Sequence, residues 1–251
     1  MTTIQTNPKY SHLSGFIESI PHVFSASGDT IHEGRNTIKV FTLPDGTMLN
    51  VKRYHRPSGP NLLIYSSGIR KPKGLRAYNY PQILLSRGIS TPEAVAYIEE
   101  RRFGLLGFSY FVSIQCPYEH TLYDIGNAEE GTYETLAAEF ARFTATIHEK
   151  QLMHLDYSPG NILYTRTPSD GYRFSLVDIN RMYFGSVTMQ KGLSNFKRLW
   201  GPKRFFKLMI REYAAARGFD EEEALAYAME ERRKFWTRYQ KKHEVDFRLE
   251  L

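Results

Sequence analysis

Short runs of strand-forming residues dominate the first third of the chain. Thr37–Leu43 and Met48–Tyr54 flank a Pro-Asp-Gly turn and together predict an antiparallel hairpin. A third strand is expected near Asp29–Glu33. Residues 57–74 are rich in Gly, Pro and Ser, so they predict a loop around a short strand at Leu62–Tyr65.

One short helix and two more strands are expected next. The helix covers Pro81–Arg87 and ends at Gly88, because proline suits a first helical turn and glycine suits a helix end. Strands are predicted at Glu93–Arg102 and Leu106–Ile114.

The pattern becomes helical after residue 117. Apolar residues spaced by three and four predict a helix over about residues 132–150; they are Leu136, Phe140, Phe143 and Ile147. Two short strands follow at Ile162–Thr165 and Arg173–Val177, and the chain from Leu193 onward is mainly helical. This order predicts an α+β fold with a β-rich N-terminal lobe at residues 1–115, containing one short helix, and a mainly helical C-terminal lobe at residues 116–251.

Composition narrows the class of protein. Of 251 residues, 41% are hydrophobic and 14% aromatic, enough for a buried core. The formal charge of +6 favours an anionic partner, whether a nucleic acid, a phosphorylated ligand or an anionic membrane. Cys116 is the only cysteine, which excludes an intrachain disulfide and a multi-cysteine zinc site.

No segment has the pattern of a targeting or membrane-spanning sequence. The first twenty residues lack the apolar core of a secretory signal, and no apolar run approaches the roughly 18 residues of a membrane span. We therefore expect a cytoplasmic protein, soluble or peripheral to a membrane.

The strongest chemical signal is a polar loop at His154–Asn161. His154, Asp156 and Asn161 lie between the long helix and a short strand, and Asp178 ends the next apolar strand. Phosphoryl transfer needs this grouping, because one carboxylate orients the acceptor hydroxyl while an amide oxygen and a second carboxylate hold magnesium.

Several segments resemble one family in their order along the chain. Besides the polar loop, these segments are Gly88–Ala96, Asp178–Arg181 and Ser194–Leu199. They resemble the lipopolysaccharide core sugar kinases of the Kdo/WaaP family, and the resemblance spans about residues 28–200. It implies a bilobal protein-kinase-like fold.

The resemblance also implies residue roles. Asp156 would be the catalytic base, Asn161 and Asp178 would bind Mg²⁺, and His154 would brace the metal-binding segment. Lys52 ends an apolar strand, where the lysine of the family reaches the α- and β-phosphates of ATP.

Further nucleotide contacts are expected on two connecting segments. Gly34 and Arg35 occupy the place of a glycine-rich phosphate loop, although only one glycine is present. Arg35 can pair with phosphate oxygens or be an ordinary surface turn residue. Gln115 and Cys116 follow the fifth strand of the lobe, where they would line the hinge that holds adenine; a packed thiol is the alternative for Cys116.

One departure affects the mechanism. Residues 46–92 contain no Asp or Glu, although kinase-like enzymes pair the lysine with a helix glutamate. Glu93 or Glu99 could replace it, Asn79 could hydrogen-bond Lys52, or the site could be impaired. A degenerate kinase that binds a nucleotide or a partner is therefore an alternative.

The acceptor is expected to be a sugar. Ser158 stands where serine/threonine kinases carry lysine, and no Ala-Pro-Glu triplet follows Asp178. The family resemblance implies Kdo or heptose of a lipopolysaccharide core or lipid A precursor, reached at the inner face of the inner membrane. An atypical protein kinase is the other enzymatic alternative. A nucleic-acid partner is not expected, because no nucleic-acid-binding motif is visible. The protein is expected to be a monomer.

Two basic patches lie outside these motifs. One comprises Arg70, Lys71, Lys73 and Arg76, and the other is distributed over residues 191–211 among aromatic residues. The second patch suits docking on an anionic membrane if Trp200, Phe205 and Phe206 are exposed. The alternative is a helix that packs these rings inward.

Overall fold

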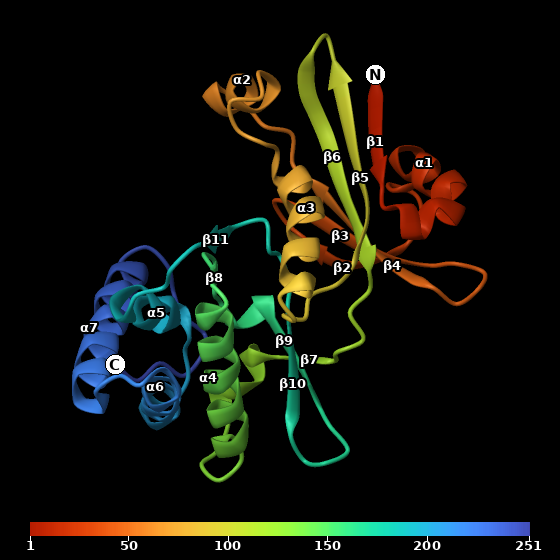
Figure 1. Cartoon of the computed structure of the whole chain (residues 1–251). Coiled ribbons are helices and arrows are strands. Elements are labelled where there is room, and N and C mark those ends of the chain that lie inside the picture. The colour runs from red at the N-terminus through yellow and green to blue at the C-terminus, as the bar shows by residue number, and fades with distance from the viewer. The chain divides into compact units, whose positions relative to one another are not determined.

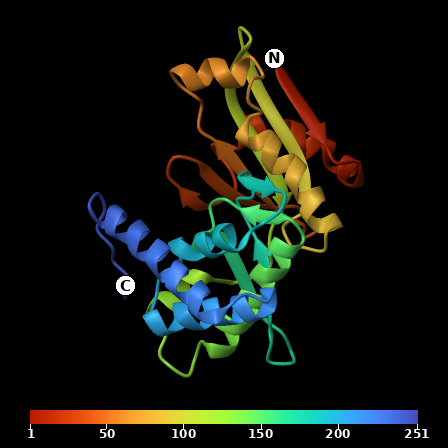
Figure 2. The same ribbon diagram turned by 60° about the vertical axis from the view of Figure 1, so that its left-hand side comes forward.

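A computed structural model describes residues 1–251, apart from the side chain of Asn127. The chain divides into unit 1, Met1–Pro117, and unit 2, Tyr118–Leu251. Figures 1 and 2 show the course of the chain from two directions. A sheet dominates unit 1 and helices dominate unit 2, so the predicted α+β fold class is confirmed. The prediction of one short helix in the N-terminal lobe is wrong, because three α-helices form there.

Unit 1 is built on a six-stranded sheet with the order β1-β5-β6-β4-β3-β2. All neighbouring strands are antiparallel. The strands are β1 (Thr2–Thr6), β2 (Asp29–Glu33), β3 (Thr37–Thr42), β4 (Met48–Tyr54), β5 (Ala94–Arg102) and β6 (Leu105–Ile114). The five strands predicted on this sheet form, and β1 adds an edge strand that the sequence pattern did not reveal.

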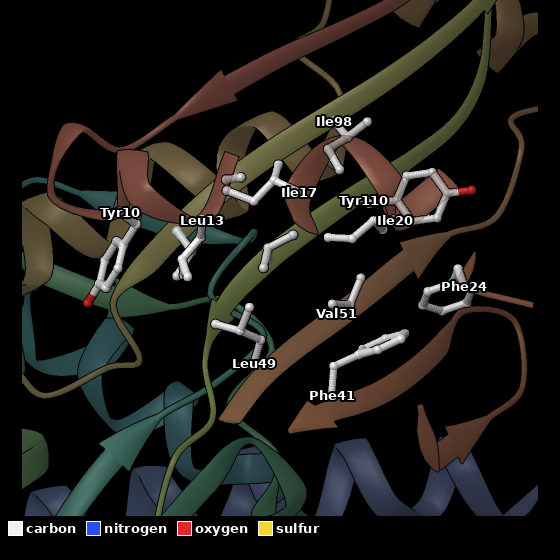
Figure 3. Packing of buried hydrophobic residues seen from close by; sticks show 13 residues of the cluster. Tyr10, Leu13, Ile17, Ile20, Phe24, Phe41, Leu49, Val51, Ile98 and Tyr110 are labelled. Atoms are coloured by element: carbon white, nitrogen blue, oxygen red, sulfur yellow. The ribbon is translucent and has the colours of Figure 1, made fainter. Parts of the chain in front are cut away.

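The core of unit 1 lies under a helix near its N-terminus. The 3₁₀-helix η1 (Pro8–Leu13) leads into α1 (Ser14–Val23), and Ile17, Ile20 and Phe24 are fully buried. Figure 3 shows these side chains facing Val51 and other apolar residues of the sheet. Their spacing of three and four residues places them on one helical face, which explains why α1 covers the sheet.

The helix α3 (Lys73–Ser86) packs against β5 and β6. Its buried positions, Gly74, Ala77, Pro81 and Leu84, recur at helical spacing. A Cβ atom at Gly74 would lie 2.8 Å from the Tyr97 ring of β5, so only glycine permits this close approach.

Two predictions between residues 57 and 87 are wrong. The expected strand at Leu62–Tyr65 is instead part of α2 (Pro60–Ser66), because Pro60 starts a helical turn and a short apolar run fits either structure. The helix expected from Pro81 begins at Lys73. Pro81 lies inside it, since burial of the apolar stripe outweighs the lost backbone hydrogen bond.

Unit 2 contains four α-helices and two small sheets among its described elements. The helices are α4 (Glu134–Glu149), α5 (Met189–Asn195), α6 (Lys203–Arg217) and α7 (Glu221–Gln240). Three 3₁₀-helices also form: η2 (Leu122–Asn127) before α4, η3 (Pro159–Asn161) between β8 and β9, and η4 (Phe196–Arg198) between α5 and α6. One sheet has the order β10-β9-β7 and the other pairs β11 with β8. These strands are β7 (His120–Thr121), β8 (Leu152–His154), β9 (Ile162–Arg166), β10 (Tyr172–Leu176) and β11 (Met182–Phe184).

The aromatic residues of the segment 191–211 face inward. Phe205 and Phe206 are 2% and 0% exposed, and Trp200 stacks on Phe247 at a ring distance of 4.2 Å. The condition for membrane docking, exposure of Trp200, Phe205 and Phe206, is therefore not met, and the packing alternative is correct. Among the described residues, no helix is long and apolar enough to span a membrane.

Gly74→Ala should lower the free energy of unfolding by about 1–3 kcal/mol, because the added methyl group meets the Tyr97 ring. Gly15→Ala is the matched control. Nothing lies within 4 Å of its Cβ position in α1, so it should be neutral or stabilise by up to about 1 kcal/mol. Urea denaturation measures both values, and equal effects would contradict the close packing at Gly74.

Candidate active site

The polar loop of the sequence starts at a short strand of unit 2. β8 pairs with β11 in a register that sets His154 opposite Met182. The loop then runs from Leu155 to η3, which begins at Pro159, where proline fits the first helical position. The loop is thus held at both ends by regular structure.

His154 is buried and joins the loop to the strand that precedes Asp178. The backbone N–H of Asp156 donates to its Nδ1 at 3.0 Å, so Nε2 carries the proton and donates to the carbonyl oxygen of Val177 at 3.1 Å. Burial lowers the pKa of His154 below its ordinary value, which favours this neutral ring.

Asn161 closes the same loop. Its side-chain Nδ2 donates to the backbone carbonyl oxygen of Asp156 at 2.8 Å, and its backbone carbonyl oxygen accepts from the N–H of Val177 at 3.0 Å. Because the amide nitrogen is used within the loop, the amide oxygen is the atom suited to a metal.

Asp178 follows β10 in a left-handed backbone conformation, with φ of 52°. Side chains other than glycine seldom adopt this region, and such strain is concentrated at functional sites. Nδ2 of Asn180 donates to Oδ1 of Asp178. Because His154 and Asn161 both bond to the backbone of Val177, the polar loop is joined directly to the residue before Asp178.

The donor atoms at this place fit magnesium. Asn161 and Asp178 offer amide and carboxylate oxygens, which are the ligands Mg²⁺ prefers. Within the described part of the chain, no group of three or more His, Cys, Asp or Glu residues forms a metal cluster. Mg²⁺ commonly binds through only one or two protein side chains, with water and phosphate completing its shell.

Two arginines contact the side chain of Asp156, and sequence reasoning gave neither a role there. Arg198 of η4 pairs with Oδ1, and Nη1 of Arg181 lies 3.4 Å from Oδ2. Arg198 belongs to the Ser194–Leu199 segment already noted in the sequence. Its contact with Asp156 joins residues far apart in the chain, so the sequence offered no local signal for it.

A buried chain of hydrogen bonds supports the loop from behind. Nδ2 of Asn195 donates to the carbonyl oxygen of His154 at 2.9 Å. The Asn195 amide oxygen then accepts from Nε2 of His148 at 3.2 Å, which leaves Nδ1 to accept from the Tyr213 hydroxyl at 2.8 Å. Nη1 of Arg217 donates to that hydroxyl at 3.0 Å.

Every hydrogen bond of this series donates in the direction of the polar loop, so α4, α5 and α6 jointly fix the carbonyl of His154. Burial lowers the pKa of His148 to about 4 and raises the pKa of Tyr213 to about 12. The imidazole therefore stays neutral and the phenol stays protonated at pH 7, as the chain requires. His148 belongs to none of the sequence motifs, so its place in this network was not predicted.

In unit 1, Lys52 lies on β4 and is buried. Its Nζ is 5.4 Å from the centre of the Tyr54 ring. The two carboxylates considered as its partners have other contacts: Glu93 binds Lys9 and Tyr10, and Glu99 binds Arg101 and Tyr97.

The other predicted nucleotide contacts lie at two places on unit 1. Gly34 and Arg35 form the exposed turn between β2 and β3. Gln115 and Cys116 follow β6, where Oε1 of Gln115 accepts from Asn50 at 2.8 Å and Cys116 is a partly buried free thiol. Their roles in nucleotide binding stay predictions.

Comparison with solved structures identifies the fold. A structure described as WaaP in complex with acyl carrier protein matches with a TM-score of 0.59 and 17% identity, covering 93% of this chain and 99% of that chain. The chain has a protein-kinase-like fold. This result confirms the fold that the sequence resemblance implied.

Two structures of the Rio2 kinase from Chaetomium thermophilum also match, both at 12% identity. The ADP/Mg²⁺-phosphoaspartate complex has a TM-score of 0.49, covering 95% of this chain and 78% of that chain. The other structure has a TM-score of 0.44, covering 96% and 84%. No family model and no curated protein sequence matches this chain.

Acid should destabilise the protein between pH 6.5 and about 4. The unfolded chain protonates His148 near its ordinary pKa of 6.5, whereas the folded protein resists protonation until about pH 4. Since stability falls where the unfolded state binds more protons, His148 alone should cost up to about 3 kcal/mol across this window. Urea unfolding at several pH values measures the slope.

His148→Gln should make that slope shallower, and the exposed His243→Gln should leave it unchanged. An identical slope in wild type and His148→Gln would show that the folded protein does not hold this imidazole neutral.

Proposed function

We propose that this protein is an ATP- and Mg²⁺-dependent kinase that phosphorylates a hydroxyl of a lipopolysaccharide core sugar, Kdo or heptose. The observation that carries the proposal is the joined arrangement of His154, Asp156 and Asn161 with the strand end before Asp178. Phosphoryl transfer depends on positioning and on charge stabilisation, which such a braced polar loop can provide.

The residues of unit 2 would act as follows. Asp156 would orient the acceptor hydroxyl and accept its proton, while the backbone bonds to His154 and Asn161 keep its loop in place. Asn161 and Asp178 would hold Mg²⁺, which when bound neutralises negative charge on the phosphates.

The residues of unit 1 would bind the nucleotide. Lys52 would contact phosphate oxygens, Gly34 and Arg35 would approach the phosphates from the β2–β3 turn, and Gln115 with Cys116 would line the adenine position. In this proposal residues 1–115 and 116–251 act as the two lobes of one kinase-like domain.

The charge around Asp156 supports an anionic acceptor. Arg198 and Arg181 place guanidinium groups beside the carboxylate that would receive the hydroxyl. Guanidinium groups bind carboxylates and phosphates well, and Kdo carries a carboxylate of its own. A lipid-linked acceptor would further place the protein at the cytoplasmic face of a membrane.

A second candidate is a degenerate kinase that binds a nucleotide without efficient transfer. The observation that favours it is the composition of α3, which carries neither Asp nor Glu and so has no counterpart of the helix glutamate of kinase-like enzymes. The two candidates make the same prediction for ATP binding and opposite predictions for transfer.

Titration calorimetry with ATP, with and without Mg²⁺, tests the nucleotide site. Wild type should bind ATP in a Mg²⁺-dependent manner, and Asp178→Ala should lose that dependence because a carboxylate ligand is removed. Asp170→Ala is the control, since Asp170 also has a positive φ, of 58°, but lies in the exposed β9–β10 turn. Absence of wild-type binding at millimolar ATP would refute the kinase proposal.

Asp156→Ala should lower phosphate transfer to a Kdo- or heptose-containing acceptor by about 10²- to 10⁴-fold, because the proton acceptor is lost. ATP affinity should stay within about twofold. Radiolabelled phosphate transfer measures the first quantity and calorimetry the second. Wild-type ATP binding without transfer to either sugar would favour the degenerate kinase.

A further inference from the structure

One end of unit 1 brings α2 and the tip of the β5–β6 hairpin together. Nη1 of Arg101 donates to the carbonyl oxygens of Ser66 and Gly104, both at 2.9 Å. The N–H of Leu106 donates to the Ser66 hydroxyl at 2.9 Å. Figures 1 and 2 both draw α2 beside this hairpin, so residues distant in sequence form one surface.

This hairpin-end surface exposes large apolar side chains. They are Phe103, 91% exposed, Ile69, 80%, Leu63, 65%, and Leu105, 40%. Single exposed apolar residues are ordinary on soluble proteins, but a group of them on adjoining segments marks an interaction site.

Phe103 is also strained. It and Gly104 form the hairpin turn with φ of 51° and 77°, as a type I′ turn requires at both central positions. Asn or Gly normally occupies the first of these positions, and a bulky side chain there is a conformational outlier. The chain thus keeps a largely exposed phenyl ring, with the Arg102 guanidinium 5.4 Å from its centre, where folding alone favours another residue.

The surrounding charge is strongly positive. Unit 1 has 13 basic and 7 acidic residues, a formal charge of +6, whereas unit 2 has 20 of each and none of the net charge. Arg70, Lys71 and Arg102 are exposed on or next to the hairpin-end surface. Of the nearby acids, Glu99 is buried against Arg101 and Glu100 is partly buried.

We propose that the hairpin-end surface docks unit 1 on an anionic lipid bilayer. Protruding apolar side chains would enter the interface while flanking Arg and Lys contact lipid phosphates, the combination that gives stable peripheral binding. The apolar residues lie on the hairpin turn, at the start of β6, on α2 and in the segment just after it. None of the proposed catalytic residues belongs to this surface, so the inference stands or falls independently of phosphoryl transfer.

Vesicle sedimentation tests the inference directly. Wild type should sediment with vesicles of phosphatidylglycerol and phosphatidylethanolamine at low salt and dissociate from them at high salt. It should not bind vesicles of phosphatidylcholine. Failure to bind the anionic vesicles at low salt would overturn the inference. Binding instead to polyglutamate, blocked by the same substitutions, would assign the surface to an acidic polypeptide.

Phe103→Asn separates docking from folding. It should weaken vesicle binding by about tenfold, since a phenyl ring no longer enters the interface. Its melting temperature should equal or exceed that of wild type, because Asn tolerates the turn conformation better. Ile69→Ser should also weaken binding, whereas Ile31→Ser, at an exposed isoleucine of β2, should not. Equal loss in Ile31→Ser would overturn the inference.

Two double variants that remove the same charge test the electrostatic part of the inference. Arg70→Gln with Lys71→Gln should weaken binding by roughly tenfold or more, because each cation near an anionic bilayer contributes substantially. Lys241→Gln with Lys242→Gln removes the same charge from an exposed pair in unit 2. If both double variants bind equally, net charge and not this surface determines vesicle binding.

Discussion

The geometry of the candidate site depends on one buried imidazole. His154 accepts from the backbone of Asp156 and donates to the carbonyl of Val177, so a single ring fixes the position of two chain segments. A protonated ring could not accept the first of these bonds, and burial disfavours protonation. The proposed base and the proposed metal ligand are therefore positioned by the same neutral side chain.

The helices of unit 2 extend this constraint. The chain from Arg217 through Tyr213, His148 and Asn195 ends on the carbonyl of His154, and all its donors point the same way. Hydrogen bonds aligned in this manner polarise one another in a low-dielectric interior. The packed helices thus contribute to the precision of the loop as well as to stability.

The polar loop at His154–Asn161 could be recognised in the sequence because its residues are close together and their spacing reflects one loop. Strands such as β3 and β4 were also predictable, since their apolar residues flank a recognisable turn. α2 and the start of α3 were not. Their short apolar runs and internal proline fit several local structures, and packing against the sheet decides between them.

Contacts over long sequence distances were beyond sequence reasoning. The pairing of Arg198 with Asp156 depends on how η4 returns to the loop, and the inward packing of Phe205 and Phe206 depends on the other helices of unit 2. The charges can be counted from the sequence, but their concentration in unit 1 became visible only once the division at residue 117 was known. Likewise, the sequence did not reveal that basic residues of the stretch 46–92 lie near the exposed hairpin turn.

Gly192 illustrates how the buried network constrains variation. A Cβ atom there would lie 2.0 Å from the Tyr213 hydroxyl and 3.2 Å from Nδ1 of His148, so a side chain at 192 and the Tyr213 hydroxyl exclude each other. Phenylalanine at 213 would remove the closest of these contacts, but the ring carbon Cζ would still lie 3.0 Å from the added methyl group. Which residues fit at position 192 therefore depends on both position 213 and position 148.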